Sequence, residues 1–466
     1  MDMINNIINS INTFLWSYIL IFLLIALGLY FTFKTKFVQF RYFKEMFILL
    51  GEGTSKDDKN SVSSFQAFCM STASRVGTGN LAGIAISISI GGAGSIFWMW
   101  LIAIIGAASS FIESTLAQIY KEKEPSGAFR GGPAYYMEKA LKKRWLGIIF
   151  SILITITFGL IYNSVQSNTI ASAMNQAFGT NKILIAVILT VFTALIIFGG
   201  VQRIAKFTEI IVPIMAGSYI LIALFIMVTN LDRIPSMFAL IMENAFGFKE
   251  VVGGGLGAAM MQGIKRGLFS NEAGEGSAPN AAATATVSHP VKQGLIQALG
   301  VFTDTLLICS CTAFIILLSD VDYVASGASG IELTQQALSS HVGSWGTYFI
   351  AIAVLLFAFS SIVGNYYYGE SNIEFITDKK IYLQLYRVFV IAMVFFGCIS
   401  SMDIVWNLAD VFMGLMALLN LGAITFLAKY AVKSLEDYTT QKKAGIKSPV
   451  FKASSIPELE NVTEWD

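Results

Sequence analysis

Histidine is scarce in this chain, and paired cysteines are missing from it. The 466 residues include two histidines, His289 and His341, and four cysteines, none of them in a CxxC pair. This argues against a histidine-based metal centre or catalytic triad. The cysteines lie within apolar segments, where cysteine acts as a small apolar residue. Because no cluster of Asp, His and Ser has catalytic spacing, we predict that the chain is not an enzyme.

Charged residues are also few. They make up 13% of the chain, whereas soluble domains carry about 25%. The net charge of +1 gives no reason to expect nucleic acid as a partner, and no obligate protein partner is evident. Hydrophobic residues account for 55% of the chain and fall in long runs. This composition excludes an ordinary soluble domain and predicts an all-α, multi-pass protein surrounded by membrane lipid.

Crossing a bilayer takes about 20 mostly apolar residues. Eleven segments meet this requirement, and we predict a transmembrane helix for each. They lie at residues 14–33, 62–90, 94–119, 146–173, 183–199, 207–228, 251–269, 293–318, 346–368, 382–399 and 404–427.

Basic residues predict the orientation, because cytoplasmic loops carry the excess of Lys and Arg. If the spans alternate in direction, the Lys- and Arg-rich connections all fall on one side, together with the C-terminal residues. On the opposite side, the connection from Asp320 to His341 has neither Lys nor Arg. We therefore predict a protein of the cell (inner or plasma) membrane, with its N-terminus outside and its C-terminus cytoplasmic.

With the first span set aside, ten spans remain, which divide into two five-helix halves. Five is odd, so the halves insert with opposite orientation. Glycine-interrupted spans fall at the first position of each half, near Gly77–Gly79 and Gly253–Gly257, and such a pair is typical of secondary transporters. Alternatively, these glycines simply let helices approach closely. The predicted divisions are an N-terminal helix and linker (1–60), a first repeat (61–230), a second repeat (231–430) and a loosely ordered, polar cytoplasmic tail (431–466).

The stretch from Ser71 to Gly83, STASRVGTGNLAG, lies inside the second predicted span. Gly77 and Gly79 bracket Thr78, and glycine lowers the cost of leaving the helix. A helix broken at membrane depth must line a cavity or bind a ligand, because lipid cannot satisfy free backbone groups. Its first half offers carbonyls to a cation, and the half restarting at about Asn80 offers amides to a carboxylate. The stretch therefore predicts adjacent sites for sodium and a small zwitterion.

Further polar residues within apolar segments allow two interpretations each. Arg75, near mid-bilayer, should pair with Glu113 or Asp304, or else contact the substrate. Asn163 and Gln166 share one helix face and could bind substrate or join neighbouring helices.

Two more segments remain open in the same way. Ser360 and Ser361 could complete an oxygen shell for sodium, or could bond to their own helix backbone. The polar stretch 265–279, KRGLFSNEAGEGSAP, could be a gate or hinge at the cytoplasmic end of the second broken span, or a plain connection.

Five stretches together resemble the alanine/glycine:cation symporter family: GTGNLAG, FRGGPAYY, VQSN, KRGLFSNEAGEGSAPNAAA and NYYYGE. The resemblance covers residues 61–429. It implies sodium-driven, sometimes proton-driven, uptake of a small neutral amino acid. It also implies eleven helices, ten of them in the inverted-repeat arrangement shared with neurotransmitter:sodium symporters.

The resemblance further implies roles for individual residues. Asn80 matches the asparagine that contacts the substrate backbone, and Gln166 matches a glutamine in the pocket. The substrate carboxylate would meet the amides of Thr78 and Gly79. Sodium would be held by the carbonyls of Ala73 and Val76 and by the hydroxyls of Ser360 and Ser361, by analogy of fold.

One position departs from the family pattern. Many members place a tryptophan that caps a tight pocket where this chain has Asn365. Asparagine is smaller and can bond to a side-chain amide or hydroxyl. Our hypothesis is that the pocket accepts a larger polar substrate, such as glutamine, as well as or instead of alanine.

The sequence thus predicts a sodium-coupled symporter of alanine, glycine or glutamine that works by alternating access. A proton-coupled carrier of the same fold is the alternative. A membrane-embedded enzyme would need a catalytic cluster that is missing here. A channel usually needs rings of like residues from an oligomer, which nothing in the sequence indicates.

Overall fold

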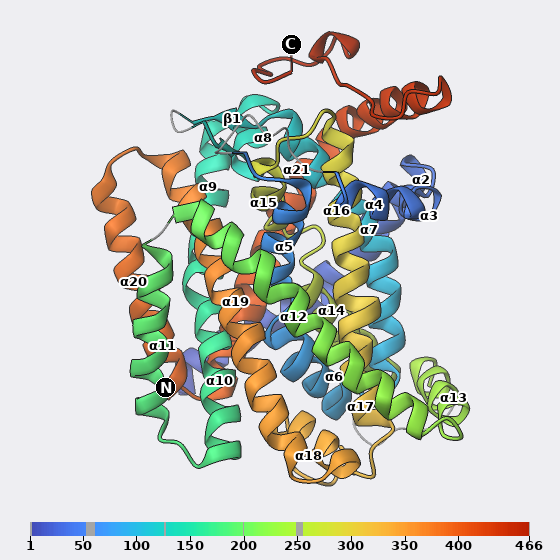
Figure 1. Cartoon of the computed structure of the whole chain (residues 1–466), viewed down its shortest axis with the longest axis vertical. Helices are drawn as coiled ribbons and strands as arrows, with labels where there is room; N and C mark the ends of the chain where they lie inside the picture. Colours follow the sequence, from blue (N-terminus) through green and yellow to red (C-terminus); the bar gives the residue numbers. More distant parts are fainter. Residues whose placement is uncertain (1, 53–60, 125–126, 199, 248–254, 466) are drawn as a thin grey trace.

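The computed structural model describes residues 2–52, 61–124, 127–198, 200–247 and 255–465 (Figure 1). Almost all of the described elements are helices. Up to residue 229 they are α1 (Asp2–Phe14), η1 (Leu15–Leu20), α2 (Ile21–Lys34), α3 (Val38–Arg41), α4 (Phe43–Leu50), α5 (Ser64–Arg75), η2 (Gly79–Gly83), α6 (Ile84–Gly91), α7 (Ser95–Ile119), α8 (Pro133–Lys139), α9 (Arg144–Ile154), η3 (Thr155–Tyr162), α10 (Asn163–Phe178), α11 (Lys182–Ile197) and α12 (Gly200–Thr229).

The remaining helices follow residue 230. They are α13 (Ile234–Ala245), α14 (Gly255–Asn271), α15 (Ala278–Thr284), α16 (Pro290–Val301), η4 (Phe302–Cys309), α17 (Ser310–Leu317), α18 (Ile331–Val342), α19 (Trp345–Ile376), α20 (Lys380–Ile399), α21 (Met402–Lys443) and η5 (Ala453–Ser455). Two short strands, β1 (Glu122–Lys123) and β2 (Phe129–Arg130), pair antiparallel, with Glu122 opposite Arg130.

Eight helical runs among the described residues are long and apolar enough to cross a membrane, which confirms the multi-pass helical class. They are Ile7–Lys34, Ser95–Ile119, Arg144–Phe178, Lys206–Thr229, Pro290–Leu317, Trp345–Ile376, Lys380–Ile399 and Met402–Lys443. Two shorter apolar helices, Gly79–Gly91 and Lys182–Ile197, overlap two further predicted spans. The count of eleven spans and the inverted repeat stay predictions.

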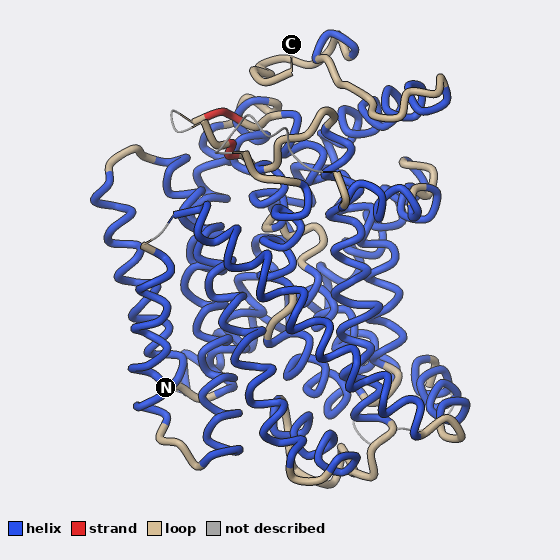
Figure 2. The backbone as a smooth tube through the Cα atoms, in the orientation of Figure 1, coloured by secondary structure: helices blue, strands red, loops and turns tan. Residues whose placement is uncertain are grey.

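Several runs contain a π-helical segment, which follows the break in one run and lies inside the run in others. These segments, η2, η3 and η4, carry the polar residues Asn80, Tyr162 and Asp304. Such π segments often occur at functional sites, because they redirect backbone groups and side chains without ending the helix. Figure 2 shows loop segments inside the helical bundle as well as at its two ends.

The two ends of the bundle differ in what they carry. In Figure 1, β1, α8, α4 and the C-terminus lie at the upper end, whereas α13, α18 and the N-terminus lie towards the lower end. Alternating spans place the Lys- and Arg-rich connections and the C-terminal residues on one side. The connection that contains β1 and α8 and the C-terminal residues both lie at the upper end.

The second interruption lies further along the chain than the sequence analysis placed it. Gly255 and Gly257 belong to α14, which continues to Asn271, and Gly253 and Gly254 lie outside the described residues. The helix ends instead before 272–277, the middle of the stretch expected to be a cytoplasmic gate or loop, and α15 follows. Of the predicted glycine cluster, Gly255 begins α14 and Gly257 lies inside it without a break, because glycine permits a break without requiring one.

The residues after α21 are folded against the upper end of the bundle, in contrast to the loosely ordered tail expected. Phe451, Ile456 and Trp465 are buried together, and Trp465 Nε1 donates to the carbonyl of Gln118 over 2.9 Å. These aromatic contacts were missed because the segment reads as polar overall.

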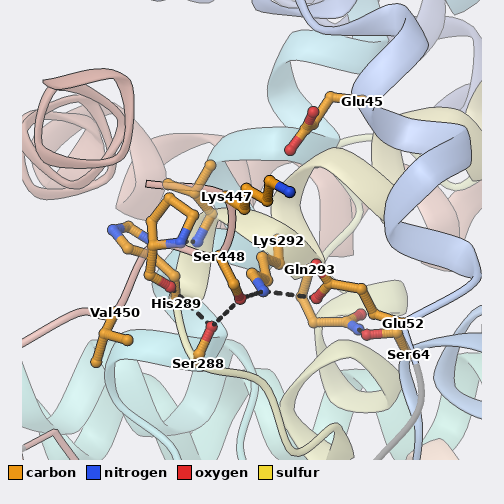
Figure 3. A network of polar contacts seen from close by, with 12 residues as sticks. Glu45, Glu52, Ser64, Ser288, His289, Lys292, Gln293, Lys447, Ser448 and Val450 are labelled. Carbon is orange, nitrogen blue, oxygen red and sulfur yellow. Dashed lines mark hydrogen bonds and ion pairs between the residues drawn. The ribbon is translucent and has the colours of Figure 1, made fainter. Parts of the chain in front are cut away.

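Polar contacts join the start of α16 to this C-terminal segment, to α21 and to Glu52 (Figure 3). Lys292 Nζ bonds to Glu52, at 2.5 Å, and to Ser448. His289 Nδ1 accepts from the backbone of Val291, and its Nε2 faces Asp437 at 3.1 Å. Burial lowers the pKa of His289, and the hydrogen bond to Asp437 opposes this shift. This pattern requires a neutral His289 ring, because Nδ1 can accept from Val291 only if it carries no proton.

Candidate functional site

The first break lies between α5 and η2, as predicted. α5 starts with a capping box, in which Ser63 and Gln66 each accept from the other's backbone N–H. The helix ends at Arg75, and the Gly77 amide then donates to Asn80 Oδ1 over 2.8 Å. Helical structure resumes at Gly79, close to the predicted restart at Asn80.

Two residues predicted to bind substrate contact each other across this break. Gln166 Oε1, from α10, accepts from both the backbone N–H and the hydroxyl of Thr78, at 2.9 and 2.6 Å. Both side chains are buried. Gln166 therefore lies at the broken helix, and in this structure it satisfies the Thr78 amide.

Asn80 connects the break to two other helices. Its Nδ2 donates to Asp304 Oδ1 over 2.6 Å, while Asp304 Oδ2 accepts from Ser270 of α14 and from Thr305. All of these groups are buried. The sequence analysis predicted for Asp304 only a possible pairing with Arg75. Its place inside an apolar span was the signal that could have drawn attention to it, since such residues are functional candidates by default.

The four predicted sodium ligands lie together. Ser361 Oγ is 2.8 Å from the carbonyl oxygen of Ala73 and 3.5 Å from that of Val76. Ser360 Oγ is 3.5 Å from the same Ala73 oxygen. Both hydroxyls also bond to the Phe357 carbonyl of their own helix, which is the alternative interpretation of the two serines.

These oxygens are neutral and fully buried. Within the described ranges, no group of three or more His, Cys, Asp or Glu side chains could hold a metal ion. A cation at this place would therefore depend on carbonyl and hydroxyl oxygens, which suit a hard ion of low charge. The donor set fits sodium.

Asn365 is buried beside this cluster, one turn beyond Ser361 on α19. Its Nδ2 donates to Asn163 Oδ1 over 3.1 Å, and its Oδ1 lies 2.7 Å from the hydroxyl of Ser74. The predicted amide pair Asn163 and Gln166 thus divides: Asn163 contacts α19, and Gln166 contacts the break.

The second break, between α14 and α15, is stabilised by side chains of distant helices. Glu272, Gly274 and Gly276 all have positive φ, so the chain turns sharply between α14 and α15. The Glu113 carboxylate, from α7, accepts from the amides of Gly274 and Gly276, each at 3.1 Å. Asn420 of α21 donates to the same carboxylate over 2.7 Å. The carboxylate replaces the backbone acceptors that the amides of Gly274 and Gly276 lose where the helix is interrupted.

Arg75 does not pair with either predicted acid. Its Nη1 donates to the carbonyl of Gln297 over 3.2 Å, and its Nη2 donates to Ser110 over 3.2 Å. The side chain is 1% exposed. Glu113 bonds to the second break, and Asp304 bonds to Asn80. Neutral oxygens of α7 and α16 therefore solvate the Arg75 guanidinium instead.

Lys265 and Arg266 lie within α14, not in a polar end loop. Lys265 Nζ is 3.1 Å from Asp410 Oδ2, and Arg266 makes two contacts of 2.9 Å with the same carboxylate. All three side chains are buried. Asp410 comes from α21, so this buried ion cluster ties the helix before the second break to the last long helix.

Comparison with known proteins identifies the family. The sodium:alanine symporter family model matches residues 1–453. The chain belongs to the sodium:alanine symporter family. Among curated relatives, it is similar to "Probable sodium/glutamine symporter GlnT" of Bacillus subtilis, with 58% identity covering 100% of this chain and 96% of the relative.

Other relatives of the family agree over nearly their full lengths. "Amino-acid carrier protein AlsT" of Bacillus subtilis is 56% identical, covering 99% of this chain and 98% of that protein. "Sodium/alanine symporter AgcS" of Methanococcus maripaludis is 34% identical, covering 95% and 99%. This member of the sodium:alanine symporter family is thus a transporter and not an enzyme.

Solved structures show the same fold at low sequence identity. A manganese transporter of Eremococcus coleocola superposes with a TM-score of 0.55 at 14% identity, covering 85% of this chain and 94% of that one. A Na+-coupled sialic acid symporter superposes with a TM-score of 0.55 at 13% identity, covering 89% and 90%. The fold is therefore that of membrane transporters.

Proposed function

We propose that this protein carries out sodium-coupled symport of a small neutral amino acid (alanine, glycine or glutamine) into the cell by alternating access. The observation that carries the proposal is the meeting of the Ala73 and Val76 carbonyls with the Ser360 and Ser361 hydroxyls beside the first break. Membership of the family and the relatives named for sodium, alanine and glutamine support it.

The same proposal includes the architecture. An N-terminal helix (residues 1–60) would precede two inverted five-helix repeats (61–230 and 231–430), eleven spans in all, and the residues 431–466 would lie in the cytoplasm. Breaks at α5–η2 and α14–α15 support the repeat, because the one lies within and the other directly after the first predicted span of its half. The N-terminus would be outside.

Within the pocket, Thr78, Gly79, Asn80, Gln166 and Asn365 would contact the amino acid. In this structure the Thr78 amide donates to Gln166. An incoming carboxylate would have to replace that contact, because one N–H makes one good hydrogen bond. Asn80 is engaged on both sides, by Gly77 and Asp304, so besides contacting the amino acid it would hold the shape of the break.

The deciding experiment is uptake of labelled alanine and glutamine into proteoliposomes under an inward sodium, potassium or proton gradient. Accumulation that requires sodium supports the proposal. Accumulation that requires only a proton gradient would mean that the protein is an amino-acid carrier coupled to protons and not to sodium, which is the alternative function. Uptake under none of the gradients rejects amino-acid symport of these substrates.

Replacing Ser361 with alanine is expected to weaken the response to sodium. The change removes one of four proposed oxygen ligands, and the hydroxyl also bonds to Ala73 at 2.8 Å. Loss of one ligand should raise the sodium concentration for half-maximal uptake about tenfold, equivalent to about 1.4 kcal/mol. Uptake measured against sodium concentration tests this, with Ser361→Thr as the variant that keeps the hydroxyl. An unchanged sodium response in Ser361→Ala would remove Ser361 from the site.

Replacing Asn365 with tryptophan is expected to shift preference from glutamine towards alanine and glycine. The larger side chain would fill space and displace the contacts with Ser74 and Asn163. The ratio of glutamine to alanine uptake should fall about tenfold, the size of a lost hydrogen bond plus a steric clash. Competition between the two labelled substrates measures the ratio. If it does not change, Asn365 does not set specificity.

A further inference from the structure

The hydroxyl of Ser74 lies between two groups that normally only accept hydrogen bonds. Its Oγ is 2.7 Å from Glu272 Oε1 and 2.7 Å from Asn365 Oδ1. A serine hydroxyl has one hydrogen, so it can donate to one of them. At the other contact the partner must supply the hydrogen, because two bare acceptors at this distance repel.

Asn163, at the other end of this series of hydrogen bonds, determines which group donates in each one. Asn163 Nδ2 donates to the carbonyl of Gly159 over 3.0 Å, and a carbonyl can only accept. Asn163 must therefore turn its Oδ1 to Asn365, which answers with its own Nδ2. This leaves Asn365 Oδ1 facing Ser74, and Ser74 must donate to it.

The missing hydrogen then belongs to Glu272. We propose that Glu272 is a proton-binding site: its carboxyl is protonated on Oε1 and donates to Ser74, which donates to Asn365. Glu272 Oε2 still accepts from Ser277 at 2.6 Å, as the remaining oxygen of a carboxylic acid can. The buried side chain, 1% exposed, favours the uncharged form.

Two neighbouring buried acids show the opposite pattern. Glu113 receives two backbone amides and the Asn420 amide, and Asp304 receives the amide of Asn80 and two hydroxyls. Amides cannot be turned into acceptors, and they face both oxygens of Glu113 and Oδ1 of Asp304, so a proton on any of these oxygens would meet no acceptor among these partners. Glu272 has only hydroxyl partners, Ser74 and Ser277, and the hydrogen of Ser74 is already donated to Asn365.

The backbone at Glu272 gives independent support. Its φ is +57°, in the left-handed region that glycine adopts most easily. Gly274 and Gly276, in the same connection, also have positive φ. A glutamate in this strained place indicates that its side chain is needed there.

Charged and titratable groups surround the site on several elements. Arg75 of α5 and Asp304 of η4 face Glu272, together with Glu275 of the same connection. Tyr162 of η3 and Tyr368 of α19 also face it. Asp304 and Glu275 favour the protonated form and Arg75 favours the anion, so the site can both hold and release a proton.

Release of this proton would change what Asn365 offers. Ser74 would turn its hydrogen to the new carboxylate, and Asn365 Oδ1 would become free to accept from a substrate N–H. This link to substrate rests on the proposed function of Asn365, whereas the proton on Glu272 does not. The proton and a substrate with an extra amide donor, such as glutamine, would therefore oppose each other.

The proton is tested first, without substrate or ion gradient. Infrared spectra of the purified full chain near neutral pH should contain the carbonyl stretch of a protonated carboxylic acid that disappears in Glu272→Gln and persists in Glu275→Gln. Ser74→Ala, which leaves the carboxyl in place, should shift this band, because its hydrogen-bond acceptor is gone. A band that persists in Glu272→Gln, or that Ser74→Ala does not shift, overturns the proton site.

The link to substrate is tested second, by uptake. Raising the pH should lower the KM for glutamine about fivefold relative to that for alanine, the effect of one additional hydrogen bond. Glu272→Gln, whose amide donates to Ser74 as the protonated acid would, should make the ratio of KM values independent of pH. A ratio independent of pH in the wild-type protein overturns the link. Failure of all uptake would reject the transport proposal and leave the infrared result standing.

Discussion

Gly77→Ala should reduce sodium-driven amino-acid uptake to less than about a tenth, because overpacking a tight site costs roughly 1–3 kcal/mol. A Cβ at this position would lie 2.2 Å from Ser361 Oγ and 2.8 Å from Gln166 Oε1. It would push against a proposed sodium ligand and a proposed substrate residue at once. Uptake of labelled alanine and glutamine in proteoliposomes measures the effect.

Gly83→Ala is the matched control in the same broken helix. There the nearest atom to an added Cβ, on the Trp406 ring, is 3.4 Å away, an ordinary contact. We expect near wild-type uptake from this variant. Equal uptake from the two variants would show that the close packing around Gly77 does not matter for transport.

Glu113→Gln should lower the free energy of unfolding by about 2–3 kcal/mol, because a buried donor left without an acceptor costs roughly this much. The carboxylate accepts from Gly274, Gly276 and Asn420. Glutamine keeps one acceptor oxygen and turns an NH₂ group towards at least one of these donors. Denaturation of the purified protein in detergent measures the loss, and uptake should fall with it.

Glu122→Gln is the control for this change. Glu122 pairs with Lys139 at 3.0 Å, but its side chain is 42% exposed. Exposed ion pairs contribute about 0–1 kcal/mol, so little change is expected. A Glu113→Gln protein as stable as Glu122→Gln would mean that the second break does not depend on α7.

The first break could be predicted from local sequence. Gly77 and Gly79 interrupt an apolar run, and the structure ends α5 at Arg75 and restarts the helix at Gly79. The neighbourhood of Ser361 and Ala73 was expected only from the family resemblance. Their 288-residue separation along the chain hides this contact from any local pattern.

The second break could not be located in the same way. The glycines near 255 attracted the prediction, yet α14 begins at Gly255 and continues through Gly257 to Asn271. What ends the helix at Asn271 is a carboxylate from Glu113, more than 150 residues away, which replaces the lost helical partners of Gly274 and Gly276. Periodicity and composition carry no information about such a distant acceptor.

The sequence by itself determined the membrane class, the mostly helical architecture, the first break and the family. These follow from apolar run length, residue composition and short motifs, which are properties of neighbouring residues. The tertiary structure decided which carboxyls receive fixed donors, where the second break lies, that Arg75 is solvated by Gln297 and Ser110, and that the C-terminal segment packs onto the bundle. The physical reason is that buried polar groups must find partners wherever the fold places them, and those partners come from distant parts of the chain.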